Sequence, residues 1–288
     1  MKLADYIIQY LADLGVKDIF VVYGSANGDL IDAFTRINTT RYICVMHEQA
    51  GSFAAECYAK ITGKPAVAIA TSGPGGMNFV TGIGNCYYDS IPCLFITGQV
   101  NSQFLRPDPS IRQVGFQETD IVGIVTPITK YAKMVVDPYS FKYELEKALY
   151  IAQNGRPGPV LLDLPLDIQK RDIDIAKMVG YEPPAKNTPF DLDTVDAQID
   201  GYLEDLQKSE RPVILVGGGV RIANAVDDVR ALGLKLKIPC FPTWNALDII
   251  TSDYKLYGGR VGTYGGPGRN LGLQNSDLLL AIGSRISG

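Results

Sequence analysis

A glutamate and a glycine-rich segment are the residues best placed for chemistry in this sequence. Glu48 follows the strand-like run 42–46 and opens a helix-like run that continues to about residue 61. The next strand-like run, 65–70, leads directly into Thr71-Ser72-Gly73-Pro74-Gly75-Gly76. Both features follow the carboxyl ends of predicted strands, which is where ligands bind in open α/β sheets. We therefore expect a carboxylate and a loop of close backbone approach to share one site.

The histidine and cysteine content, and the absence of a P-loop lysine, argue against several classes of active site. His47 is the only histidine, so a multi-histidine metal site is excluded and any Ser-His or Cys-His mechanism would have to use it. The glycine-rich segment lacks the lysine of a phosphate-binding P-loop, which argues against nucleotide hydrolysis. The five cysteines are odd in number and form no Cys-x-x-Cys pair, which favours reduced thiols in a cytoplasmic protein.

The bulk composition argues against two classes of partner. A net charge of −4 provides no basic face of the kind that binds nucleic acid. No apolar run approaches the roughly 20 residues that span a bilayer, and the N-terminus lacks the apolar core of a signal peptide. We expect neither nucleic acid nor membrane as a partner.

The elements that must position these residues alternate between strand and helix. This alternation implies βαβ units and mainly parallel sheets covered by helices on both faces. In the first part of the chain the patterns predict strands at 18–22, 42–46, 65–70, 92–97, 131–136 and 160–164, and helices at 3–14, 29–36, 49–61, 77–88 and 140–153.

A proline-rich segment divides the chain into two predicted domains. Residues 1–170 form the first domain, 171–190 the linker, and 191–288 a second α/β domain. The second domain is predicted to contain helices at 193–207 and 220–232 and strands at 212–216, 238–241 and 277–282. Because the chain stops one turn after a strand, we expect this Rossmann-like domain to be incomplete and to belong to a longer or split enzyme. The fold class is therefore α/β, with two doubly wound, mainly parallel-sheet domains.

The first domain resembles the pyrimidine-binding domain of thiamine-diphosphate-dependent enzymes in the acetolactate synthase, pyruvate oxidase and benzaldehyde lyase group. Residues 190–288 resemble the central domain of the same group, and the segments around Gln99 and Arg156 are most similar to acetolactate synthase. The resemblance rests on segments that occur in order: His47-Glu48-Gln49-Ala50, Thr62-Gly63-Lys64-Pro65, Ala70-Thr71-Ser72-Gly73-Pro74-Gly75, Ile96-Thr97-Gly98-Gln99-Val100, Phe116-Gln117-Glu118 and Gly155-Arg156-Pro157-Gly158-Pro159.

The resemblance implies a role for each matching residue. Glu48 matches the glutamate that hydrogen-bonds N1′ of the aminopyrimidine and so promotes loss of the C2 proton of the cofactor, a role that requires an apolar pocket. Pro74, Asn78 and Gln99 match positions that bind the cofactor. The alternative for Glu48 is a helix N-terminal acid that stabilises the helix dipole.

The resemblance also implies residues that contact a substrate. Phe116, Gln117 and Lys130 match positions around the substrate approach, where a cation suits an anionic 2-oxo acid. The alternatives are a core phenylalanine and a surface lysine.

A possible second cofactor site follows from the central domain. Gly217, Gly218 and Gly219 follow a strand and open a helix, and the matching loop of the family binds FAD in some members and is empty in others. Arg156, Thr243, Gly283 and Arg285 match FAD-contacting positions of acetolactate synthase. FAD stays an open alternative, because Gly259-Arg260-Val261-Gly262 replaces the Gly-Met-His-Gly segment found beside the flavin. As a nicotinamide fingerprint the loop is poor, since Ile222 stands where the third glycine belongs.

The family's Mg²⁺ and diphosphate site is a Gly-Asp-Gly segment on a third domain, and no Gly-Asp-Gly occurs in this sequence. We therefore expect no metal ligands in this chain and no activity from it as an isolated fragment. Active sites of the family lie between the first domain of one subunit and the third domain of another, which implies a homodimer or homotetramer.

The expected activity is decarboxylation of a 2-oxo acid with carboligation, as in acetolactate synthase. The alternatives are a 2-oxo acid decarboxylase, a 2-hydroxy ketone or 2-hydroxyacyl-CoA lyase, a non-catalytic binding or regulatory protein that retains the fold, and a nicotinamide dehydrogenase that uses the Gly217 loop.

Overall fold

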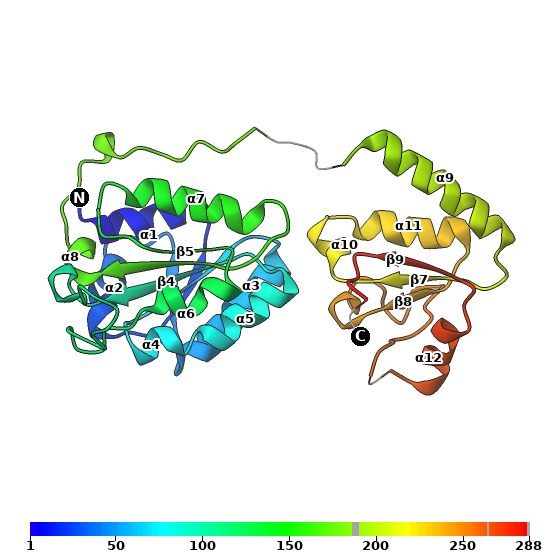
Figure 1. Cartoon of the computed structure of the whole chain (residues 1–288), viewed down its shortest axis with the longest axis horizontal. Helices are drawn as coiled ribbons and strands as arrows, with labels where there is room; N and C mark the ends of the chain where they lie inside the picture. The colour runs from blue at the N-terminus through cyan, green and yellow to red at the C-terminus, as the bar shows by residue number, and fades with distance from the viewer. Residues whose placement is uncertain (186–189, 264, 287–288) are drawn as a thin grey trace. The chain divides into compact units, whose positions relative to one another are not determined.

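Parallel strands connected by helices build both units into which the chain divides, Met1–Pro184 and Ala185–Gly288 (Figure 1). The computed structural model describes residues 1–185, 190–263 and 265–286, so residues 186–189 of the predicted linker lie outside the described residues. The predicted α/β class with mainly parallel sheets is confirmed.

The sheet of the first unit has the order β2-β1-β3-β4-β6-β5, with every neighbouring pair parallel. Its strands are β1 (Asp18–Val21), β2 (Arg41–Cys44), β3 (Ala66–Ala70), β4 (Cys93–Gln99), β5 (Tyr131–Met134) and β6 (Val160–Pro165). From β1 the chain moves to one side to form β2 and then to the other side to form β3. This reversal creates the crevice at the carboxyl ends of the strands in which doubly wound sheets bind ligands.

Helices cover both faces of this sheet (Figure 1). One face packs against α1 (Leu3–Asp13), α2 (Gly28–Ala33), α7 (Phe141–Gln153) and α8 (Leu166–Gln169), and the other against α3 (Glu48–Thr62), α4 (Pro74–Met77), α5 (Val80–Asp89) and α6 (Ile121–Val125). On α1, Leu3, Ile7 and Leu11 are wholly buried, as their helical spacing predicts. The central strands β3, β4 and β6 are buried on both faces, which explains their nearly continuous apolar runs.

The second unit contains a three-stranded parallel sheet of order β8-β7-β9. Its elements are α9 (Leu192–Lys208), β7 (Pro212–Val216), α10 (Gly219–Ile222), α11 (Val226–Leu236), β8 (Cys240–Pro242), α12 (Pro267–Gln274) and β9 (Leu278–Ile282). Single-turn 3-10 helices lie at Ser25–Asn27, Ser102–Phe104, Thr126–Ile128, Ile175–Lys177 and Trp244–Ala246.

Two of the predicted helices are interrupted in the structure. The helix predicted at 220–232 is divided into α10 and α11, because Asn224 adopts φ +54°, a left-handed conformation that an α-helix cannot continue through. The helix predicted at 77–88 is α5 preceded by the separate turn α4, which begins at Pro74. Sequence patterns also missed α12, whose glycines weaken its periodic signal. None of the helices in the described ranges is long and apolar enough to cross a membrane.

Candidate active site

Glu48 is the first residue of α3 and lies at the crevice beside β1. The helix starts here because His47 adopts an extended conformation and its Nδ1 accepts a hydrogen bond from the backbone N–H of Gln49 at 3.2 Å. The Glu48 side chain is largely buried, with 9% of the residue exposed, and its Oε2 accepts a hydrogen bond from Asn78 Nδ2 at 2.9 Å. The position also favours a negative charge through the helix dipole, so the dipole role and a chemical role coexist.

The glycine-rich segment lies directly against this carboxylate. A Cβ atom on Gly75 would lie 3.2 Å from Glu48 Oε1 and 2.7 Å from Thr71 Cγ2. Gly73 adopts φ +59°, and a Cβ atom there would lie 2.8 Å from both the Cβ and the carbonyl oxygen of Gln117. Glycine is therefore required at both positions, because the backbone approaches its neighbours too closely for a side chain.

Pro74 and Asn78 flank this contact, and their role in binding a cofactor stays a prediction. Pro74 occupies the first position of α4, where its fixed φ suits a helix start and its missing N–H costs nothing. Asn78 caps the end of the same turn and reaches Glu48. The structure thus brings Glu48, Pro74 and Asn78 together.

Phe116 and Gln117 reach the same region from a distant part of the chain. Gln117 packs over Gly73 and adopts φ +60°, which is uncommon for a residue other than glycine. Phe116 is 84% exposed, so it is not the core phenylalanine that the sequence left open. An exposed aromatic ring beside the glycine-rich segment is available to contact a ligand.

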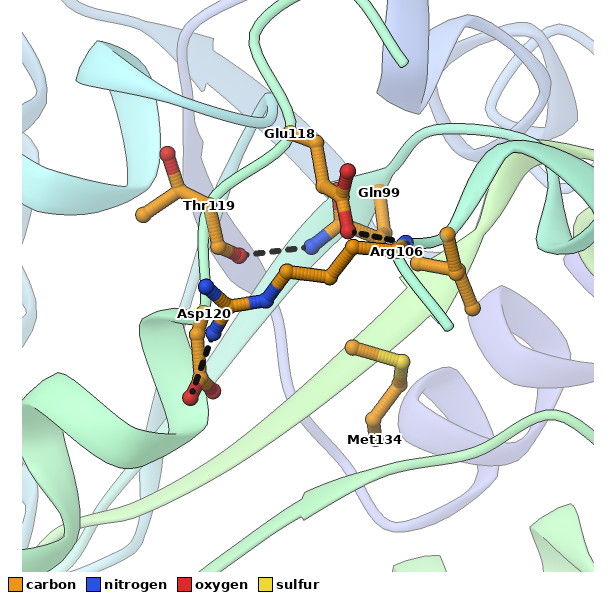
Figure 2. A pocket seen from close by; sticks show the side chains of 7 residues that line it. Gln99, Arg106, Glu118, Thr119, Asp120 and Met134 are labelled. Carbon is orange, nitrogen blue, oxygen red and sulfur yellow. Dashed lines mark hydrogen bonds and ion pairs between the residues drawn. The ribbon is translucent and has the colours of Figure 1, made fainter. Parts of the chain in front are cut away.

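Gln99 is buried beneath this segment rather than open to the crevice. Its Nε2 donates to the carbonyl of Thr119 at 2.8 Å and to Asp163 Oδ2 at 2.9 Å, and its Oε1 accepts from the N–H of Val100 at 2.9 Å. Figure 2 shows Gln99 bonded to Thr119 at the wall of a small cavity. Gln99 therefore supports the segment that carries Gln117.

Sequence reasoning missed Asp163, the partner of Gln99. Its side chain is wholly buried on β6, and burial raises the pKa of its carboxyl to about 7 despite hydrogen bonds from Thr97 and Gln99. The available signal was a single acid inside the apolar strand Val160-Leu161-Leu162-Asp163-Leu164.

Lys130, the predicted substrate cation, lies apart from Glu48 within this chain. It precedes β5 and therefore lies at the amino edge of the sheet, whereas Glu48 lies at the carboxyl edge. Its Nζ donates to the carbonyl of Asn154 at 2.7 Å and to that of Ile151, so it satisfies carbonyls at the C-terminal end of α7. Burial lowers the pKa of Lys130. The ammonium group therefore caps α7 in this chain, and contact of Lys130 with a substrate stays a prediction.

The candidate FAD residues of the second unit also meet at a carboxyl edge. A Cβ atom on Gly217 would lie 2.2 Å from the carbonyl oxygen of Gly283, and one on Gly218 would lie 2.9 Å from Asn245 Cβ. The N–H of Gly219 donates to the same Gly283 carbonyl at 3.0 Å. The glycines are thus already required by loop packing between β7 and β9, whatever the loop binds.

The other FAD candidates occupy different places. Thr243 follows β8, and its N–H donates to the carbonyl of Val216 at 2.9 Å, which places it next to the glycine loop. Arg285 is exposed after β9. Arg156 belongs to the first unit, where its Nε donates to Ser90 Oγ at 2.7 Å.

Across the described ranges, no group of three or more His, Cys, Asp and Glu side chains is arranged to hold a metal ion.

Comparison with known proteins agrees with this geometry. Residues 1–124 match the N-terminal TPP binding domain of thiamine pyrophosphate enzymes, and residues 199–288 match the central domain of the same enzymes. Thiamine pyrophosphate is another name for thiamine diphosphate.

Three curated relatives are acetolactate synthases. The acetolactate synthase large subunit of Lactococcus lactis is 36% identical over 97% of this chain and 47% of its own length. The large subunit of Corynebacterium glutamicum is 38% identical over 98% of this chain and 44% of its own length. The isozyme 2 large subunit of Escherichia coli is 35% identical over 99% of this chain and 50% of its own length.

The chain spans about half the length of these curated relatives. Its two matched regions are consecutive domains of one enzyme family, in the family's order, and they contain the sheet edge at which Glu48 meets the glycine-rich segment. The chain belongs to the thiamine pyrophosphate enzyme family, of which it carries the N-terminal TPP binding domain and the central domain.

Proposed function

We propose that this chain forms the aminopyrimidine-binding half of the active site of an acetolactate synthase-like enzyme. The proposal rests on the burial and hydrogen bonding of the Glu48 carboxylate. One carboxylate oxygen is held by Asn78, and no described residue hydrogen-bonds the other oxygen, Oε1, which faces the space beside Gly75. A largely buried carboxylate with one free oxygen suits proton sharing with a ring nitrogen.

The residues present fit thiamine diphosphate. The side-chain-free face at Gly73 and Gly75 allows a flat ring to approach the backbone, and Glu48 Oε1 lies at its rim. When bound, the cofactor supplies an electron sink for cleavage of the bond next to a substrate carbonyl. Glu48 would hold a proton at N1′ of the aminopyrimidine, Asn78 would fix the orientation of Glu48, and Pro74 would keep the glycine-rich turn in place.

The proposed reaction is decarboxylation of a 2-oxo acid followed by carboligation to a second carbonyl compound, with Phe116 and Gln117 on the substrate side. The relatives are named acetolactate synthases, which supports this reaction over the decarboxylase and lyase alternatives. We propose that Mg²⁺ holds the diphosphate at a site outside these 288 residues. We further propose that the enzyme is a homodimer or homotetramer in the cytoplasm.

We propose FAD as a second cofactor, bound at the loop that contains Gly217, Gly219 and Gly283. Flavin absorbance in the purified protein would support it. A colourless protein that binds neither added FAD nor NAD would remove both the flavin and the dehydrogenase alternative.

Exchange of the C2 proton of thiamine diphosphate for deuterium tests the central proposal. Proton NMR would follow the exchange with Mg²⁺ present, using the protein purified in its native assembly. Glu48→Gln should slow exchange by about 100-fold or more, the range that a positioned acid or base contributes. Glu56→Gln is the matched control, because Glu56 is a buried acid on the same helix that pairs with Lys60 at 2.6 Å.

Two outcomes would overturn the proposal. Exchange at the wild-type rate in Glu48→Gln would remove Glu48 from the proton relay. No exchange above the rate in solvent for the wild-type assembly would favour a non-catalytic binding or regulatory protein.

A further inference from the structure

A buried carboxylate outside the proposed catalytic set is connected to the glycine-rich segment by two separate paths. Asp163 lies on β6 with no exposed surface, on the sheet face covered by α4 and α6. Its Oδ1 accepts a hydrogen bond from Thr97 Oγ1 at 2.7 Å and its Oδ2 accepts one from Gln99 Nε2 at 2.9 Å. Both donors come from β4, the neighbouring strand.

The first path runs through Thr97 to the far end of the glycine-rich segment. The methyl group Cγ2 of Thr97 lies 3.2 Å from where a Cβ atom of Gly76 would be, so the two residues are in close contact. The hydrogen bond to Asp163 fixes the rotamer of Thr97 and therefore the direction of this methyl group. Gly76 belongs to the α4 turn that also contains Gly75, the residue packed on Glu48.

The second path runs through Gln99 to the near end of the same segment. The second hydrogen of Gln99 Nε2 bonds the carbonyl of Thr119, as Figure 2 shows. Two residues before Thr119, Gln117 rests on Gly73 in its left-handed conformation. Asp163 is therefore connected to Gly73 through Gln99, Thr119 and Gln117, and to Gly76 through Thr97.

Glu118 stiffens the loop that carries this second path. Its carboxylate accepts the N–H of Arg106 at 2.6 Å and the N–H of Val114 at 2.9 Å, which ties both ends of segment 106–114 to residue 118. The loop next to Thr119 is therefore held both by Gln99, through Thr119, and by the hydrogen bonds of Glu118.

Few charges face Asp163. β4 presents the neutral Thr97 and Gln99, and β5 presents Met134, which pairs with Asp163 in register. At the start of α6, Asp120 raises the pKa of Asp163 further, and Asp120 itself pairs with Arg106 at 3.3 Å.

The helices α8 and α7 add no cation beside Asp163. On α8, Asp167 accepts hydrogen bonds from the N–H and the hydroxyl of Ser102. The residues of α7 that pack on the sheet are apolar, and they lie on the opposite face. Asp163 has no described ion-pair partner, so its charge is stabilised by hydrogen bonds from Thr97, Gln99 and the backbone N–H of Leu164.

We propose that Asp163 is the positioning residue of the Glu48 site: its carboxylate holds both ends of the glycine-rich segment 73–76, through Thr97 and through Gln99 and Thr119, and so sets the space beside Glu48. This inference rests on the proposed function for its catalytic consequence, although the bracing itself is a property of the chain alone.

The two paths respond differently to a proton on Asp163. A hydroxyl group both donates and accepts, so Thr97 can rotate and accept from a protonated Oδ1. Gln99 Nε2 only donates, and a proton on Oδ2 would oppose it. Reversing the amide would restore that contact but would turn Oε1 towards the Thr119 carbonyl and Nε2 towards the Val100 N–H. The Gln99 path therefore requires an acceptor on Asp163, and the Thr97 path does not.

Hydrogen exchange measured by mass spectrometry on the 288-residue chain without cofactor tests the bracing. Asp163→Leu removes both paths, and amides in 73–78 and 115–121 should exchange about tenfold faster, the effect of losing a hydrogen bond that holds a local segment. Amides of β7 in the other unit should not change. Asp163→Asn can present its oxygen to Gln99 and its amide to Thr97, so it should keep both segments near wild-type protection.

Gln99→Met covers the case in which Asp163→Leu unfolds. This variant removes only the second path, so exchange should increase in 115–121 while β4 residues 93–96 stay protected. Unchanged exchange in 115–121 for Gln99→Met, or unprotected segments in Asp163→Asn, would overturn the proposal.

A second readout separates a failure of this inference from a failure of the proposed function. In the native assembly, C2 exchange should slow in Asp163→Leu and in Gln99→Met and return to near the wild-type rate in Asp163→Asn, which keeps both hydrogen bonds. Wild-type rates of C2 exchange in both Asp163→Leu and Gln99→Met would overturn the positioning role alone. Absence of C2 exchange in the wild type would instead count against the proposed function and leave the hydrogen-exchange result standing.

Discussion

Replacing Asp163 by asparagine should change how the stability of the protein depends on pH. Burial raises the pKa of the Asp163 carboxyl from its ordinary value of 3.8 to about 7 in the folded chain. The folded protein therefore keeps a proton that the unfolded chain has already lost between those two values. This contribution to stability is fully present below pH 3.8 and is lost as pH rises through about 7.

The magnitude follows from the two pKa values. They differ by about 3 pH units, and at about 1.4 kcal/mol for each unit the free energy of unfolding should fall by about 4 kcal/mol across the full range. Between about pH 5 and about pH 7 the expected fall is about 2 kcal/mol, because the slope decreases as the folded carboxyl begins to ionise near its pKa. Asp163 is wholly buried, so solvent screening does not reduce this value appreciably.

Urea unfolding of the wild type and Asp163→Asn at several pH values from about 5 to about 8 measures the effect. Asparagine does not titrate, so the difference in free energy of unfolding between the two proteins should move in favour of the variant as pH rises. All other titrating groups are shared and cancel in this difference. A constant difference between the wild type and Asp163→Asn across this range would refute the reasoning.

Three further substitutions have definite expected outcomes. His47→Ala removes the N-cap of α3 and should lower the free energy of unfolding by about 1 kcal/mol, whereas His47→Asn should restore most of it; urea unfolding would measure both. Gly98→Ala would place a Cβ atom 2.0 Å from the backbone oxygen of Ala26 and should cost about 3 kcal/mol or more, while Gly84→Ala, with open space around it in α5, should be neutral or stabilising; the two melting temperatures would be compared. Phe116→Ala should leave the free energy of unfolding within about 0.5 kcal/mol of wild type, because the ring is exposed, and should raise the KM for the 2-oxo acid in the native assembly without slowing C2 exchange.

The site could be predicted where its residues follow strand ends that are close in sequence. Glu48, Pro74 and Asn78 lie after consecutive strands, and the parallel arrangement of those strands forces their carboxyl ends to one edge. Lys130 was assigned to the substrate by resemblance, although it precedes its strand and therefore lies at the other edge.

The sequence by itself determined the alternation of strands and helices, the acid at the start of α3 and the glycine-rich turn. These features depend on neighbouring residues, because periodicity, capping and left-handed backbone conformations are local properties. It also excluded a multi-histidine metal site, because His47 is the only histidine.

Only the tertiary structure decided what holds those residues in place. Asp163 and Thr97 are 66 residues apart in sequence, and their hydrogen bond exists because β6 lies next to β4 in the sheet. The order of strands follows from how all the apolar faces are buried together, which no single segment encodes. The cost of burying a carboxylate likewise depends on everything around it, so the raised pKa of Asp163 and its two paths to the glycine-rich segment are properties of the folded chain.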